Sequence, residues 1–168
     1  MSTRVYIFAG FLDSGKTTFI NDTLSNPDFY NGEDTLLISF EEGEVPYQEN
    51  ILKRANTNLE ILDHENYTTN DLMALENKYH PTQILIEANG MMDLNAFVKE
   101  IVPENWNVVQ VLTTIDTTTF SMYVSNMRSL VYGQVVFSDL VIFNRYNRNV
   151  KKSSLRNNIK AINSNAQI

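Results

Sequence analysis

The sequence predicts an α/β protein, a three-layer α/β/α sandwich with a mostly parallel central sheet. Three observations lead to this fold class. Short apolar runs rich in β-branched residues alternate with segments of helical periodicity along the whole chain, which indicates βα units joined by right-handed crossovers. Several of the runs are apolar on both faces, as strands buried in a parallel sheet are. A glycine-rich turn joins the first run to the first helix.

The expected strands are short and end at polar or glycine residues. They cover Arg4–Ala9, Thr35–Ser39, Asn58–Leu62, Gln83–Glu87, Asn107–Ile115 and Leu140–Phe143. The expected helices cover Gly15–Ser25, Tyr47–Ala55, Thr69 to the residue before Pro81, Leu94–Ile101, Thr118–Val136 with a weak point at Gly133, and Ser153–Ile162. Asp28–Asp34 is expected to be a loop, because Asn26-Pro27 stops the first helix.

The turn after the first strand has the spacing of a phosphate-binding P-loop. Gly10 is followed after four residues by Gly15-Lys16-Thr17, between a strand and a helix. Glycines let the backbone fold around a phosphate, and the loop N–H groups with the positive end of the helix form an anion site. Lys16 is predicted to reach the β- and γ-phosphates and the Thr17 hydroxyl to hold Mg²⁺. The motif predicts a P-loop NTPase.

Three further residues of the loop are candidate nucleotide contacts. Ser14 lies inside the loop, and Thr18 is expected to touch a neighbouring phosphate. Asp13 places a carboxylate in a loop built for anions. We therefore expect the Asp13 side chain to point outward, to contact a partner or to help bind a cation.

Acidic residues follow two of the other predicted strands. Segments that leave the carboxyl ends of parallel strands face the ligand crevice, and Glu41 and Glu44 lie in such a segment. A carboxylate there is predicted to hold Mg²⁺ directly or through water. Glu87 ends a buried apolar strand, which suits the acidic residue that orients Mg²⁺ through its water shell. Gly90 leaves its N–H free to approach a γ-phosphate.

Composition limits the other classes of function. A chain of 168 residues is expected to form one domain, residues 1–168. The net charge of −7 argues against nucleic acid as the main partner. The chain has no cysteine, hence no disulfide or thiolate ligand. No apolar run approaches the ~20 residues of a membrane span. A strand begins almost at once, so we expect no signal peptide and a cytoplasmic location.

Together, the phosphate-binding loop and the acidic strand ends resemble those of the nucleotide-binding domain of the CobW/HypB/UreG family of P-loop GTPases. The similarity is greatest to the CobW branch. The resemblance covers nearly the whole chain and rests on motifs that come in the family's order. They are Gly10–Thr18, Glu41–Val45, Glu87–Gly90, Ile115-Asp116 and Ser138–Asn144.

The resemblance implies Mg²⁺-dependent GTP hydrolysis and, in many members, delivery of metal ions to a metalloenzyme client. It implies that Lys16 and Thr17 act at the phosphates and Mg²⁺. Glu41 and Glu44 match the glutamates of the family's first switch loop, while Glu87 and Gly90 match the acidic strand end and its following glycine. CobW-type chains usually continue into a further C-terminal domain.

The guanine-reading motif is altered. Asn144 matches the Asn of the family's Asn-Lys-x-Asp, but Arg145 and Asn147 replace the Lys and the Asp. An Asp carboxylate accepts two hydrogen bonds from guanine, whereas an Asn amide offers one acceptor and one donor. The mismatch should cost about 1–3 kcal/mol, and a base with a 2-oxo group would fit Asn147 better. Arg145 is expected to cover the base face.

A second departure concerns metal. The branch usually carries Cys-x-Cys-Cys before its second helix, and here Asp63-His64-Glu65-Asn66 lies in that neighbourhood. Thiolate Zn²⁺ binding is therefore excluded at this place. We expect a solvated turn there, with weak metal binding by His64 as the alternative.

The residues leave three functions open. The first is a CobW-type NTPase with Lys16, Glu87 and Glu41 as catalytic residues. The second is a nucleotide-dependent switch with little hydrolysis, which the altered base motif favours. The third is a small-molecule kinase, which would need an arginine-bearing lid, and Arg54 is the one arginine between the first helix and the fifth strand. The metal, the client and the oligomeric state, a dimer included, stay open.

Overall fold

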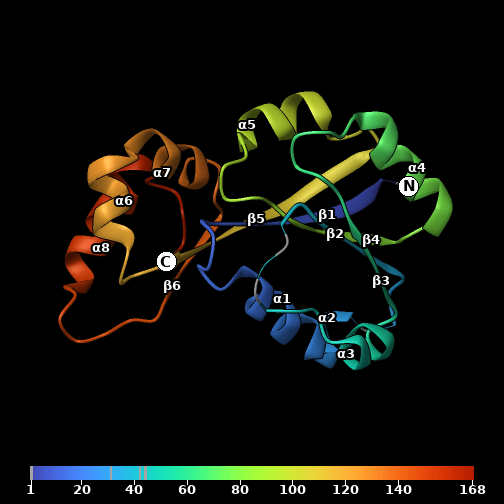
Figure 1. Cartoon of the computed structure of the whole chain (residues 1–168), viewed down its shortest axis with the longest axis horizontal. Coiled ribbons are helices and arrows are strands. Elements are labelled where there is room, and N and C mark those ends of the chain that lie inside the picture. The colour runs from blue at the N-terminus through green and yellow to red at the C-terminus, as the bar shows by residue number, and fades with distance from the viewer. Residues whose placement is uncertain (1, 31, 42, 44) are drawn as a thin grey trace.

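The fold is that of a parallel sheet with helices around it. The computed structural model describes residues 2–30, 32–41, 43 and 45–168. Six strands form one sheet in the order β3-β2-β4-β1-β5-β6, and all the strand pairs in the described residues are parallel. In Figure 1, α4 and α5 lie above the sheet, α1 to α3 lie below it, and α6 to α8 gather beside β6. The predicted fold class is confirmed.

The elements follow one another as alternating strands and helices. The strands are β1 (Thr3–Ala9), β2 (Thr35–Ser39), β3 (Thr57–Ile61), β4 (Gln83–Glu87), β5 (Trp106–Asp116) and β6 (Leu140–Asn144). The helices are α1 (Lys16–Ser25), α2 (Pro27–Tyr30), α3 (Glu49–Arg54), α4 (Thr69–Tyr79), α5 (Leu94–Ala96), α6 (Phe120–Asn126), α7 (Arg128–Val135) and α8 (Lys152–Ile162), with a π-helical turn η1 at Phe97–Ile101.

Two local predictions were wrong. Residues 27–30 form the short helix α2 rather than a loop, because Asn26 accepts a hydrogen bond from the Asp28 N–H and Pro27 suits a first helical position. The long helix predicted over Thr118–Val136 is broken at Met127 (φ −135°, ψ 43°), not at Gly133. The helix predicted over Leu94–Ile101 is present with these bounds, and it changes to π-helical geometry at Phe97.

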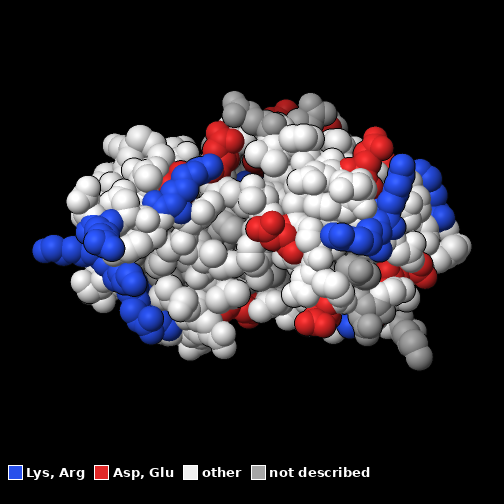
Figure 2. Space-filling view, turned by 90° about the horizontal axis from the view of Figure 1, so that it is seen from below, with Lys and Arg blue, Asp and Glu red and all other residues white. Residues whose placement is uncertain are grey.

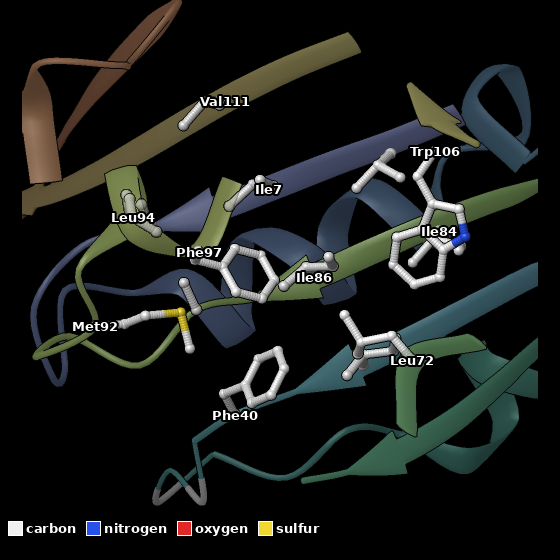
Figure 3. Close-up of a cluster of buried hydrophobic side chains, with 14 of the residues drawn as sticks. Ile7, Phe40, Leu72, Ile84, Ile86, Met92, Leu94, Phe97, Trp106 and Val111 are labelled. Carbon is white, nitrogen blue, oxygen red and sulfur yellow. The ribbon is translucent and has the colours of Figure 1, made fainter. Parts of the chain in front are cut away.

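The main core lies on the face of the sheet that α4, α5 and η1 cover. Figure 3 shows Leu72 and Phe97 from these helices facing Ile84 and Ile86 of β4. Phe40, the residue after β2, is buried in the same cluster and packs against Phe97, with ring centroids 5.7 Å apart. This contact anchors the chain immediately before Glu41.

The register of the sheet brings the strand ends together. Ser39 on β2 and Phe8 on β1 both pair with Glu87 on β4. On the other side of β1, Ala9 pairs with Thr113 of β5, and Asp116 pairs with Asn144 of β6. The segments that follow these strands therefore start from one edge of the sheet.

Charge is unevenly distributed along the chain. Six basic residues follow Asn144 with no acidic residue among them, namely Arg145, Arg148, Lys151, Lys152, Arg156 and Lys160. All of these except Lys160 are exposed. Figure 2 shows blue side chains over the end of the molecule that carries α6 to α8. Among the described helices, none is both long and apolar enough to cross a bilayer.

Leu72 offers a test of the core. Replacing the fully buried Leu72 by Ala should lower the free energy of unfolding by about 2–5 kcal/mol, because a cavity replaces packed side-chain atoms. The neighbouring Met73 is 43% exposed, so Met73→Ala should cost less than about 0.5 kcal/mol. Urea unfolding of both variants measures these changes. Equal losses of stability in the two variants would contradict the assignment of Leu72, and not Met73, to the core.

Candidate functional site

The loop between β1 and α1 needs both of its glycines. Gly10 has φ +132°, and a Cβ there would lie 2.3 Å from the Thr114 carbonyl oxygen. Gly15 has φ +101°, and its Cβ would lie 2.3 Å from Nδ2 of Asn144. No other residue fits at either position without displacing the β5 backbone or the Asn144 side chain at the end of β6. The two glycines therefore let the loop pack against the ends of β5 and β6.

The ammonium group of Lys16 is buried inside this loop. Its side chain is 2% exposed. Nζ donates hydrogen bonds of 2.9 Å to the carbonyl oxygens of Gly10 and Phe11, and it forms an ion pair of 3.1 Å with Glu41. A buried charge needs such a partner, because leaving water is costly for an isolated ion.

Glu41 bridges the two groups that the sequence predicts to bind the γ-phosphate. Besides Lys16, its carboxylate accepts a hydrogen bond of 3.3 Å from the backbone N–H of Gly90. Glu41, Gly43 and Val45 also cover the loop, and the cleft that remains there holds about 50 Å³. A triphosphate needs more room than this, so Glu41, Gly43 and Val45 would have to shift for one to enter.

Glu87 is a buried carboxylate surrounded by hydroxyl groups. It accepts hydrogen bonds from Thr17 at 2.7 Å, from Ser39 at 2.7 Å and from Tyr47 at 2.5 Å. Burial, together with the neighbouring negative charge of Glu87, raises the pKa of the Tyr47 hydroxyl far above its usual range, so Tyr47 stays a neutral donor. Within the described part of the chain, no ion pair compensates Glu87.

The carboxylate and hydroxyl of Glu87 and Thr17 suit a hard cation. Mg²⁺ prefers oxygen ligands and keeps several waters, and the pair supplies two oxygens 2.7 Å apart beside an uncompensated charge. Glu41, beside the same loop, adds a second carboxylate. The residues present therefore fit Mg²⁺.

The last residue of β6 and the residue after it contact the phosphate loop. Asn144 donates to the Ser14 carbonyl oxygen at 3.1 Å. Arg145, which has a left-handed backbone with φ 51°, donates to the Asp13 carbonyl oxygen and pairs with Asp116. Although burial opposes it, hydrogen bonds from Thr118 and Arg145 hold the pKa of Asp116 below its ordinary value. Asn147 is exposed, and its side chain accepts from the Asn149 N–H.

The other residues predicted for this site, among those that the structure describes, lie at its edges or point away from the cleft. The buried Ser14 hydroxyl bonds to Thr114 at 2.7 Å and so points toward β5. Thr18 is exposed at the cleft. Asp13 is exposed as expected, with a left-handed φ of 58°. Glu44 lies outside the described residues.

Three contributors were missed by the sequence reasoning. Ser39 has a usable signal, because a hydroxyl at the end of a buried strand faces the same sheet edge as Glu87. Asp116 belongs to a motif of the family resemblance, but no spacing rule pairs it with Arg145. Tyr47 carries no signal in sequence, since its contact with Glu87 depends on the path of the loop before α3.

The turn around His64 and the phosphate loop line one pocket. This pocket holds about 430 Å³, and Leu12, Glu41 and His64 are among its lining residues. The ring nitrogens of His64 are 3.9 Å from Asp63 and 3.8 Å from Glu65, and all three side chains are well exposed. Residues 2–30, 32–41, 43 and 45–168 contain no group of three or more side chains placed to hold a metal ion. The exposure of these side chains agrees with the expected solvated turn, and weak metal binding by His64 stays a prediction.

Comparison with known proteins identifies related chains. The sequence model of the CobW/HypB/UreG nucleotide-binding domain matches residues 4–168. No functionally curated protein sequence matches the chain. The Zn(II)-bound YjiA GTPase from E. coli is similar with a TM-score of 0.69 and 19% identity, over 99% of this chain and 56% of that one.

Two further solved structures are similar. The hydrogenase maturation factor HypB from Archaeoglobus fulgidus has a TM-score of 0.67 and 15% identity, over 99% of this chain and 79% of that one. FlhF complexed with GMPPNP/Mg(2+) has a TM-score of 0.61 and 15% identity, over 94% and 61%. At these identities the likeness shows the fold alone. The chain spans just over half the length of YjiA.

The uncompensated carboxylate yields a test by stability. In metal-free protein, Glu87→Gln should raise the free energy of unfolding by about 1 kcal/mol or more, because it removes a buried charge and keeps its shape. Glu60 is paired with Lys78 and partly exposed, so the control Glu60→Gln should lower it by up to about 1 kcal/mol. Thermal unfolding in the presence of a chelator measures the stability of both variants. A lower free energy of unfolding for Glu87→Gln than for wild type would contradict this description of the site.

Proposed function

Because the chain belongs to the CobW/HypB/UreG family, we propose that it binds a nucleoside triphosphate with Mg²⁺ at the loop between β1 and α1 and hydrolyses it slowly. GTP is the expected nucleotide. One observation carries the proposal. The residues predicted from the sequence form two hydrogen-bonded groups at the carboxyl edge of the sheet, Lys16–Glu41–Gly90 and Thr17–Glu87. The Ser39 hydroxyl connects them, since it lies within hydrogen-bond distance of both the Glu41 carbonyl oxygen and the Glu87 carboxylate.

Binding would exchange one anion for another. The Lys16 ammonium and the Gly90 N–H now contact the Glu41 carboxylate, and both are the kind of donor that holds a γ-phosphate. When the phosphates enter, these donors would turn to them, and Glu41 would move away together with Gly43 and Val45. The released Glu41 would then be free to orient water or Mg²⁺.

Hydrolysis would depend on positioning and charge stabilisation. Water attacks the γ-phosphorus as the bond to the β-phosphate oxygen breaks, and negative charge grows on the leaving oxygen. Lys16 would neutralise part of that charge. Thr17 and Glu87 would hold Mg²⁺, which supplies further charge neutralisation when bound. Ser39 and Tyr47 would fix the direction of the Glu87 carboxylate through the hydrogen bonds they already donate.

Related structures support the nucleotide and the cation. FlhF, which shares the fold, was solved with GMPPNP and Mg²⁺, and YjiA is described as a GTPase. YjiA was also solved with Zn(II). Delivery of a metal ion to a client enzyme is a further role that the family resemblance implies. His64, with Asp63 and Glu65, is the place in this chain where weak metal binding would be sought.

A switch with little hydrolysis is the second candidate, and the closed loop favours it. The ion pair of Lys16 with Glu41 and the cleft of about 50 Å³ leave too little room for a triphosphate, so binding would require this site to rearrange. A protein that changes shape in this way can signal without fast turnover. Comparing nucleotide affinity with turnover separates the two candidates.

The first test is a binding titration. With Mg²⁺ present, fluorescent GTP should bind, and Lys16→Ala should weaken binding by at least about tenfold because charge-assisted hydrogen bonds to phosphate are lost. Lys53 is 80% exposed and pairs only with Glu49 among the described residues, so Lys53→Ala is the control and should bind as wild type does. Equal affinity in Lys16→Ala, or no binding by wild type, would sink the proposal.

Base choice can be tested at Asn147. Asn147→Asp restores two acceptors for guanine, so GTP affinity should rise by about 5- to 150-fold, the equivalent of 1–3 kcal/mol. XTP should lose affinity in the same variant, because its 2-oxo group would face a carboxylate. Competition titrations with GTP, XTP and ATP measure both changes. An unchanged ratio of GTP to XTP affinity would show that Asn147 does not read the base.

A further inference from the structure

Gln134 is a buried polar residue that the proposed function does not use. It lies on α7, more than a hundred residues from the phosphate loop in sequence, and it is 1% exposed. Its Oε1 accepts a hydrogen bond of 3.0 Å from the N–H of Gly10. Its Nε2 donates to the carbonyl oxygens of Gly90 and Met92, both at 3.2 Å. One side-chain amide therefore joins the start of the phosphate loop to the loop that follows β4.

The chemistry of the contact suits an amide. The site presents one N–H donor and two carbonyl acceptors, and a Gln side chain offers the matching acceptor and two donors. A Glu would set an oxygen against two carbonyl oxygens, and an apolar side chain would leave three buried backbone groups without this partner. Thr113 and Ser138 both donate to the Gln134 carbonyl oxygen, at 2.9 and 3.1 Å. These bonds tie the backbone of Gln134 to β5 and to the end of α7.

The two loops that Gln134 joins also touch directly. A Cβ on Gly90 would lie 2.9 Å from both the Leu12 nitrogen and the Phe11 Cα. Gly90 is therefore packed on the backbone of the phosphate loop, where a side chain has no room. Its N–H points to Glu41, and its carbonyl oxygen points to Gln134.

We propose that Gln134 is a positioning residue that fixes the Gly90 N–H relative to the phosphate loop, and so sets the preference for triphosphate over diphosphate. The proposal rests on the proposed function. Gly90 is the donor assigned to the γ-phosphate, and a diphosphate has no γ-phosphate for it to bind. Loss of the amide bridge releases Gly90 and Met92, and it affects a triphosphate more than a diphosphate.

The test compares two nucleotides in two variants. Gln134→Met keeps the length of the side chain and removes its hydrogen bonds. Gly133→Ala is the control, since it changes the neighbouring residue of α7 at a position with no atom within 4 Å of a new Cβ. The readout is the ratio of the dissociation constants for GDP and GMPPNP, measured with Mg²⁺.

Gln134→Met should weaken GMPPNP binding by about tenfold, the loss of one good hydrogen bond, and change GDP binding by less than about threefold. Gly133→Ala should keep the wild-type ratio. An equal loss for both nucleotides would mean that Gln134 only stabilises the fold, and no change would mean that it has no part in binding. Either result overturns the proposal.

Two additions keep the test decisive. If Gln134→Met does not fold, Gln134→Glu is the second variant. It keeps the acceptor for the Gly10 N–H and places an oxygen against the Gly90 and Met92 carbonyl oxygens. The same loss of preference for GMPPNP over GDP is expected. Hydrogen exchange of residues 88–92 in the nucleotide-free protein should be faster in either variant, with α8 unchanged. If wild type binds neither nucleotide, the proposed function fails on its own, and unchanged exchange at residues 88–92 then overturns the bridge as well.

Discussion

The site depends on the ion pair between Lys16 and Glu41. An ammonium group that is 2% exposed cannot stay charged at low cost without an anion beside it. In the described chain that anion is Glu41, from the segment after β2. The carbonyl oxygens of Gly10 and Phe11 accept from the same ammonium, so the phosphate loop is held in shape around it. Glu41, Gly43 and Val45 line the cleft beside the loop.

This arrangement explains why the site is closed yet suited to phosphate. Glu41 presents two oxygens to Lys16 and Gly90, which a γ-phosphate would also do. Glu87 differs, because hydroxyl groups surround it and no cation compensates it in the described residues. The Glu41 carboxylate is therefore already paired with a cation, and a phosphate could replace it. The Glu87 carboxylate has no such partner among the described residues and could bind a cation. In the proposed function, a nucleotide that binds with its metal ion would meet both needs together.

Much of the fold followed from sequence because its signals are local. The strand β4 was predicted with its observed bounds, and so was the convergence of Glu41, Glu87 and the glycine-rich loop, since parallel strands end at one edge. Local signals also failed at α2, where Asn26-Pro27 ends one helix and begins another. The break between α6 and α7 at Met127 could not be predicted, because neither a glycine nor a proline lies at that position. The contacts of Tyr47, Arg145 and Gln134 escaped because they depend on how loops far apart in sequence pack.

A crystal structure with GMPPNP and Mg²⁺ tests the central claim most directly. The claim is that Glu41 holds the place of a phosphate in the nucleotide-free protein. The structure should show Lys16 and the Gly90 N–H on the γ-phosphate, with the Glu41 carboxylate beyond hydrogen-bond distance of Lys16. An intact pair of Lys16 with Glu41, 3.1 Å apart as it is here, beside a nucleotide bound elsewhere would contradict it.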